Sequence, residues 1–197
     1  MSSTERIALA PFVALLRAGE VVACPTETLI GLLADALSAE AVDKVVALKH
    51  RAALDPIAVL LPDAAAVALV ARPLSARARM LALRHWPGPL TIVSWARDGL
   101  PEPLVRDGKI GMRVPGASVA LDLVRVFAGP LTATSANRSG EPPARTVADV
   151  RASLGADLGE DAIVPADAPG GAASTVVDVT TDPPTIVRAG AIDPVWE

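Results

Sequence analysis

Residues 109–137, KIGMRVPGASVALDLVRVFAGPLTATSAN, predict the class of fold. Residues 109–114 are mostly apolar, as a short buried strand is, and Pro115 ends them because proline cannot donate to a strand ladder. Residues 118–127 are predicted to form a helix that a glycine closes. Residues 131–134 are another short apolar run. A strand, a helix and a strand in succession indicate an α/β domain with a largely buried sheet.

The same alternation continues along the rest of the chain. Helices are predicted at residues 4–16, 38–49, within 62–85 and after Thr146, and strands at 21–24, 57–61, 89–95, 162–164, 175–179 and 185–187. Thr4, Ser38 and Thr146 carry hydroxyl groups of the kind that cap helices. We find neither an internal repeat nor a linker, so residues 1–197 are predicted to form a single domain. Residues 165–173, rich in proline and glycine, are the candidate mobile segment.

The composition excludes several classes of function. Of the 197 residues, 51% are hydrophobic and only 3% are aromatic, and the net charge is −4. These values argue against a protein that holds RNA by a basic surface or by stacking on bases. The single cysteine, Cys24, excludes an internal disulfide, and with two histidines it leaves too few ligands for a His/Cys metal site. We see neither a signal peptide nor an apolar run of about 18 residues that would span a membrane, and expect a cytoplasmic protein.

Polar residues lie at the ends of several predicted elements, where open α/β sheets bind ligands. They lie at residues 25–28, 49–51, 109–113 and 134–137. Each segment has a structural explanation of its own; Lys49 and Arg51, for example, can interact with a helix dipole. Arg113, in an otherwise apolar strand, needs a partner, which is either an internal carboxylate or the carboxylate or phosphate of a substrate. The chain has no Walker A loop and no G-x-S-x-G elbow, so a nucleotide is held without a P-loop and Ser135 is not interpreted as a hydrolase nucleophile.

Together, these four segments and three others resemble the TsaC/YrdC family of threonylcarbamoyl-adenylate synthases. The matching segments are PTETLIGL at 25–32, KHR at 49–51, WPGPLT at 86–91, MRVP at 112–115, SANRSG at 135–140, STVV at 174–177 and VRAG at 187–190. One such segment is weak evidence, but seven in register span nearly the whole chain. The chain is similar to the short bacterial form of the family.

The resemblance implies a single YrdC/RibB-like α/β domain, in which a twisted, mixed, open sheet flanked by helices surrounds a concave cleft for ATP and L-threonine. The implied threonine contacts are Thr26, Arg113, Ala133 and Ser174. The implied ATP contacts are Lys49, Arg51, Lys109, Ser135, Asn137, Pro143 and Arg188. Lys49 and Arg51 are the expected catalytic cations, and Mg²⁺ is expected to enter with ATP, without a protein side chain assigned to it. Residues 138–145 are the candidate lid, with Arg138 and Arg145 directed toward an anionic ligand.

The chain departs from the family pattern at four positions. Leu60 stands where many longer members have a histidine, and Ile30 where an aromatic residue is usual. Ala52 and Ala189 stand where proline is common. These replacements bear on the residue assignments at the threonine pocket, and the role of the histidine is not transferred to Leu60.

The implied activity joins L-threonine, bicarbonate or CO₂ and ATP into threonylcarbamoyl-adenylate and pyrophosphate, for a transferase partner that forms threonylcarbamoyladenosine (t6A) in tRNA. Direct contact with tRNA stays open. Two alternatives also stay open. A carbamoyl-transfer module that handles carbamoyl-adenylate has the same fold, and omission of threonine from an assay separates it. A non-catalytic module for tRNA or double-stranded RNA would show salt-dependent RNA binding without ATP turnover.

Overall fold

The computed structural model describes residues 7–50 and 56–194. The strands are β1 (Val22–Pro25), β2 (Ile30–Leu33), β3 (Ala58–Leu60), β4 (Leu90–Trp95), β5 (Lys109–Arg113), β6 (Leu131–Ser135), β7 (Thr175–Asp178) and β8 (Thr185–Arg188). The α-helices are α1 (Ala10–Arg17), α2 (Ala39–Lys49), α3 (Val67–Val70), α4 (Ala76–His85), α5 (Val119–Phe127) and α6 (Val147–Leu154), with short 3₁₀ helices η1 (Glu102–Leu104) and η2 (Glu160–Ala162).

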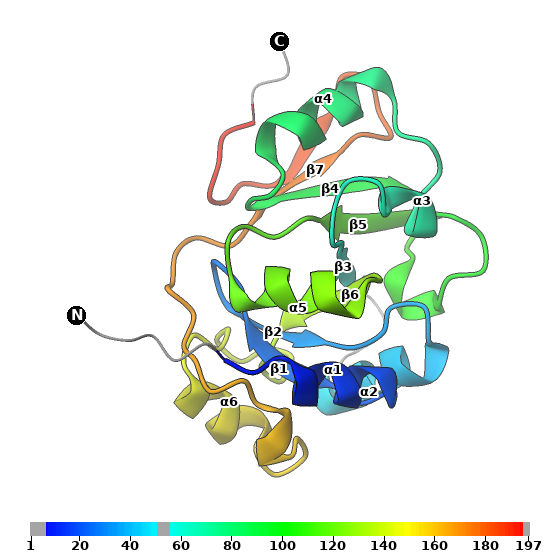
Figure 1. The fold of residues 1–197 in the computed structure, drawn as a ribbon. Helices are drawn as coiled ribbons and strands as arrows, with labels where there is room; N and C mark the ends of the chain where they lie inside the picture. The colour runs from blue at the N-terminus through cyan, green and yellow to red at the C-terminus, as the bar shows by residue number, and fades with distance from the viewer. Residues whose placement is uncertain (1–6, 51–55, 195–197) are drawn as a thin grey trace.

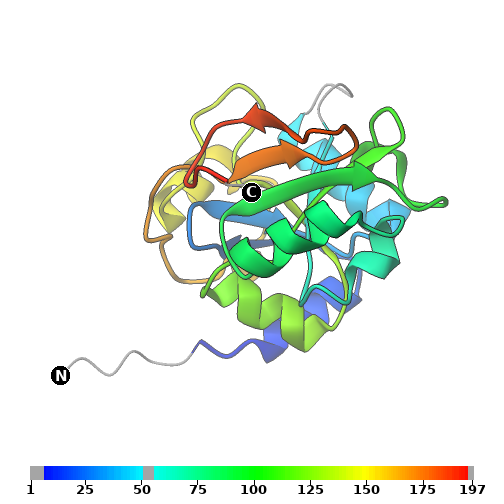
Figure 2. The same cartoon turned by 90° about the horizontal axis from the view of Figure 1, so that it is seen from above.

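All eight strands belong to one open, mixed sheet in the order β1-β2-β6-β3-β5-β4-β7-β8. The pairs β3 with β5 and β4 with β7 are parallel, and the other neighbouring pairs are antiparallel. Helices α1, α4 and α5 lie on the same side of the sheet in both views (Figures 1 and 2). The predicted α/β class and the mixed open sheet are therefore confirmed.

Local capping signals predicted the helix starts well. The Ser38 hydroxyl accepts a hydrogen bond from the backbone N–H of Ala41 at 3.3 Å, and α2 ends at Lys49 as expected. Thr146 caps α6 and forms a reciprocal capping box with Asp149. Thr4, the predicted first cap, lies outside the described residues. The predicted helix at 4–16 begins too early, because residues 7–9 are not helical and α1 begins at Ala10 without a side-chain cap.

Two strand assignments needed correction. Strand β2 was not predicted, although it pairs along its whole length with β1. The predicted strand at 162–164 is wrong, because Ala162 ends η2 and only one isolated bridge links Ile163 to β1. These apolar residues are buried by packing. Pro165 follows them, and its lack of an N–H prevents the ladder from extending.

The core is aliphatic, as the composition implies. Its largest fully buried side chains are mainly leucine and isoleucine. Cys24 belongs to this core, and burial raises the pKa of its thiol far above the ordinary value. It is therefore a packing residue in the described structure. No helix in residues 7–50 and 56–194 combines the length and apolar character needed to cross a bilayer.

Candidate functional site

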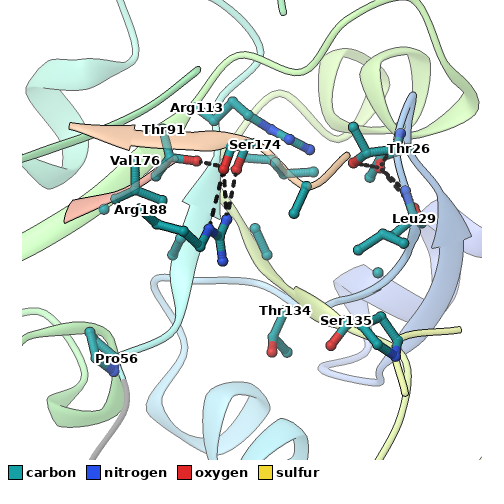
Figure 3. Close-up of a pocket in the computed structure, with 18 of the residues that line it drawn as sticks. Thr26, Leu29, Pro56, Thr91, Arg113, Thr134, Ser135, Ser174, Val176 and Arg188 are labelled. Atoms are coloured by element: carbon teal, nitrogen blue, oxygen red, sulfur yellow. Dashed lines mark hydrogen bonds between the residues drawn. The ribbon is translucent and has the colours of Figure 1, made fainter. Parts of the chain in front are cut away.

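A pocket of about 900 Å³ lies over the sheet and is lined by residues from β2 to β8. Its walls include ten of the predicted site residues: Thr26, Lys49, Lys109, Arg113, Ala133, Ser135, Asn137, Pro143, Ser174 and Arg188. Arg51 lies outside the described residues. Figure 3 shows the labelled side chains arranged around an open centre. Segments distant in the sequence thus converge on one cavity.

Strand β5 supplies two cations to this pocket because successive side chains of a strand point to opposite faces. Lys109, Gly111 and Arg113 line the pocket, whereas Ile110 and Met112 are buried in the core. One short strand therefore contributes both to the packing of the sheet and to the charge of the site.

Arg113 is buried beside an internal carboxylate and also lines the pocket. Its Nη1 lies 3.6 Å from Oε1 of Glu27. Burial lowers the pKa of Arg113, the negative charge of Glu27 opposes that effect, and the positive charge of Arg188 adds to it. Both alternatives for its partner thus retain support: an acidic neighbour is present, and the guanidinium also reaches a cavity.

The Glu27 carboxylate is unusual for a buried group. Both oxygens are shielded from solvent, and neither has a hydrogen-bond partner within the described structure. Gly116 leaves space for it, since a Cβ there would lie 3.1 Å from Cγ of Glu27. Buried carboxylates are costly unless paired, so this group depends on Arg113 for compensation.

Lys49 is buried at the C-terminus of α2, and its ammonium is directed toward β6. Nζ donates to the backbone oxygens of Ser135 at 2.6 Å and Asn137 at 2.7 Å. Lys49 therefore joins α2 to the segment that follows β6, in addition to lining the pocket.

Asn137 has its amide orientation fixed by the loop around it. Nδ2 donates to the backbone oxygens of Arg138 at 2.9 Å and Glu141 at 2.8 Å. Oδ1 is buried and has no hydrogen-bond partner among the described residues. An acceptor of this kind at a pocket wall suits a ligand that brings an N–H or O–H group.

Ser174 lies at the centre of a hydrogen-bonded group that links three elements (Figure 3). Its hydroxyl lies 2.9 Å from that of Thr91, and its backbone oxygen accepts from Nη2 of Arg188 at 2.9 Å. Thr91 also lines the pocket. Thr91 belongs to the matching segment at 86–91 but was not among the residues predicted for the site.

Thr26 uses its hydroxyl to close the turn between β1 and β2. Oγ1 donates to the backbone oxygen of Leu29 at 2.7 Å and accepts from the N–H groups of Thr28 and Leu29, each at 3.1 Å. The dashed lines in Figure 3 show part of this turn. Its hydroxyl thus shapes the wall of the pocket.

Lys109 pairs with Asp178, a carboxylate that was not predicted to belong to the site. Its Nζ lies 2.8 Å from Oδ2 of Asp178, and 5.4 Å from the ring centre of Trp95. Burial by itself would raise the pKa of Asp178, but hydrogen bonds from Lys109 and Thr180 outweigh it and lower the pKa. Asp178 lines the pocket, as do Arg106 and Asp107.

The expected arrangement of the 138–145 loop is partly wrong. Ser139, Gly140 and Pro143 line the pocket. Arg138, however, donates to the backbone oxygen of Ser153 and pairs with Asp157, so its charge is directed toward α6 and the segment after it. The loop therefore contributes to the wall of the pocket, but the charge of Arg138, which was expected to face an anionic ligand, does not.

Metal binding by the protein alone has no support in the described ranges, 7–50 and 56–194. They contain no group of three or more His, Cys, Asp or Glu side chains able to hold an ion.

Leu60 lines the pocket at the position where many longer family members have a histidine. It contributes an apolar wall there.

Comparisons with known proteins agree with this fold. The family model Sua5_yciO_yrdC, described as "Telomere recombination", matches residues 14–190. The threonylcarbamoyl-AMP synthase of Pyrococcus abyssi is 33% identical over 178 residues, which cover 90% of this chain and 52% of that protein. That of Bacillus subtilis is 35% identical over 193 residues, covering 96% of this chain and 55% of that protein. This chain therefore spans about half the length of these two relatives.

A solved structure of P. abyssi Sua5 complexed with L-threonine superposes on this chain with a TM-score of 0.87 at 33% identity. The match covers 94% of this chain and 56% of that one. The match over residues 14–190 and the identity to these relatives lead to one conclusion: the chain belongs to the Sua5/YciO/YrdC family.

Proposed function

We propose that the protein is an L-threonylcarbamoyladenylate synthase, which forms threonylcarbamoyl-AMP and pyrophosphate from L-threonine, bicarbonate or CO₂ and ATP. The observation that carries this proposal is the convergence of ten predicted ligand residues, from Thr26 to Arg188, on one pocket. The names of the relatives support it, as does the L-threonine in the related structure. The product would serve t6A formation in tRNA, through a transferase partner in the cytoplasm.

In this proposal the two substrates contact different walls of the pocket. Arg113 would bind the threonine carboxylate, with Ser174, Ala133 and the turn built by Thr26 completing that subsite. The ATP side would contain Lys49, Lys109, Ser135, Asn137, Pro143 and Arg188, together with Arg51. Asn137 Oδ1, the buried acceptor described above, would take a hydrogen bond from the nucleotide.

The chemistry requires two bond-forming steps. The threonine amine attacks the carbon of CO₂ and loses a proton, which gives an N-carboxylate. An oxygen of this group then attacks the α-phosphorus of ATP, the bond from that phosphorus to the bridging oxygen breaks, and pyrophosphate leaves. The protein's part is to align two anionic groups and to stabilise the charge that develops on the phosphate. No nucleophilic side chain is needed.

Mg²⁺ is proposed to arrive with the phosphates of ATP. Mg²⁺ usually keeps several waters and is bound largely through substrate phosphates, so no protein side chain is assigned to it. When bound, it would neutralise part of the phosphate charge. Positioning of the nucleotide would still fall to the chain's own cations and amide groups.

The decisive experiment measures pyrophosphate release with ATP, Mg²⁺ and bicarbonate, with and without L-threonine, while chromatography detects the product. Release that depends on threonine and bicarbonate, together with threonylcarbamoyl-adenylate, would support the proposal. ATP turnover without a need for threonine would favour the carbamoyl-transfer alternative. Salt-dependent RNA binding by a folded protein without turnover would favour the RNA-binding alternative.

A further inference from the structure

Gly111 lines the pocket at the middle of β5, so no side chain covers the backbone of the sheet at that point. It pairs with Val93 of β4, and its neighbours along the pocket face of β5 are Lys109 and Arg113. Glycine inside a strand is destabilising by roughly 0.5–1 kcal/mol relative to alanine. A residue with that cost calls for an explanation in the backbone, in the packing or in the ligand.

The backbone and the packing do not require glycine here. Gly111 is not among the glycines with positive φ, so an L-residue can adopt its conformation. A Cβ at this position would lie 3.4 Å from Cβ of Ala58 and 3.4 Å from Cγ2 of Thr91, which is ordinary van der Waals contact. At Gly190, by contrast, a Cβ would lie 2.3 Å from the backbone oxygen of Ala173, so packing does require glycine there.

We infer that Gly111 keeps space open for the substrates to meet. Because it has no side chain, a ligand can cross β5 between the two cations, Lys109 and Arg113. At about 3.4 Å per residue, the Cα atoms of Lys109 and Arg113 are roughly 13 Å apart, and Gly111 lies midway. This inference rests on the proposed function. If Arg113 holds the threonine carboxylate and Lys109 faces the nucleotide, the new bond between carbamate oxygen and α-phosphorus forms above Gly111.

A side chain at position 111 would then weaken the simultaneous binding of both substrates more than the binding of either substrate alone. L-threonine and ATP would each still reach their own cation, but they could not approach one another. A displacement of about 1 Å between reacting groups can cost about 100-fold in rate. Gly111→Val should therefore reduce product formation by about that factor, and Gly111→Ala by less.

The test uses isothermal titration calorimetry on wild type, Gly111→Ala and Gly111→Val. Binding of L-threonine, of α,β-methylene-ATP, and of L-threonine in the presence of saturating α,β-methylene-ATP is measured for each protein, alongside product formation. We expect each single affinity to stay within about threefold, while joint binding and product formation fall in order of side-chain size. Thr185→Ile, which enlarges an exposed side chain in β8 outside the pocket, is the control and should change none of these values.

Urea unfolding separates this effect from damage to the fold. Because β-branched residues are favoured in strands, Gly111→Val should unfold at the same or a higher urea concentration than wild type. Should the valine variant fail to fold, the alanine variant carries the same comparison. Wild-type joint binding and product formation in both folded variants would overturn the inference, as would an equal loss in the binding of one substrate alone. A wild-type protein that makes no product but binds both ligands would refute the proposed function and leave the binding comparison at Gly111 still decisive.

Discussion

Replacement of Lys49 by methionine should destabilise the protein far more than the same change at an exposed lysine of the same helix. The Lys49 ammonium is buried and donates to the backbone oxygens of Ser135 and Asn137 at 2.6 and 2.7 Å. Hydrogen bonds to charged groups contribute about 1.5–3 kcal/mol each, so the two together correspond to about 3–6 kcal/mol. Methionine no longer bears the cost of burying an ammonium, which offsets part of this and leaves a net loss of about 2–3 kcal/mol.

The matched control is Lys44→Met, also in α2. The Lys44 side chain is 35% exposed, pairs with Glu20 at 2.9 Å and donates to the backbone oxygen of Gly19 at 3.0 Å, so solvent screens both of its interactions. Exposed pairs of this kind contribute about 0–1 kcal/mol. Urea denaturation followed by circular dichroism gives both free energies of unfolding. Equal losses for Lys49→Met and Lys44→Met would refute the reasoning, because the Lys49 ammonium would then not hold β6 to α2.

Two further predictions follow from the walls of the pocket. Gly116→Ala would place a Cβ 3.1 Å from Cγ of Glu27, so the carboxylate that pairs with Arg113 must move. Overpacking of this kind lowers the free energy of unfolding by about 1–3 kcal/mol. Calorimetry should show weaker L-threonine binding by this variant, and an unchanged affinity would contradict the arrangement. Burial would raise the pKa of Asp178, but hydrogen bonds from Lys109 and Thr180 outweigh it and lower the pKa in the folded state. The stability that Asp178 contributes is therefore present above its unfolded pKa and is lost as the pH falls through the folded value. Asp178→Asn should accordingly flatten the acid side of a curve of stability against pH, and a curve as steep as that of wild type would show that the pair contributes nothing.

Elements that depend on neighbouring residues were predictable from the sequence. The caps at Ser38 and Thr146 act over three residues, and the structure forms both. Strand β2 was missed because its turn is closed by the Thr26 hydroxyl, without the glycine or asparagine pair that usually indicates a hairpin. The apolar run at 162–164 was misassigned because burial, and not pairing, explains it.

The site was predictable only in part, for a related reason. Cations stand out in apolar strands, so Arg113 and Lys109 could be selected from the sequence. Thr91 and Asp178 could not, since a threonine in a strand is ordinary and an aspartate near a strand end usually indicates a turn. Their importance comes from partners distant in sequence, Ser174 and Lys109, which only the sheet order brings within hydrogen-bond distance.

The pocket's cations are held by the protein itself, and this affects how the site can bind anions. Arg188 donates to the backbone oxygen of Ser174, Lys49 to those of Ser135 and Asn137, and Lys109 to Asp178. Ordering a long side chain on binding costs about 0.5–1.5 kcal/mol, and three side chains fixed in advance avoid most of that cost. Under the proposed function, the acceptors of these hydrogen bonds would therefore contribute to ligand binding by ordering the cations, in addition to any direct contact.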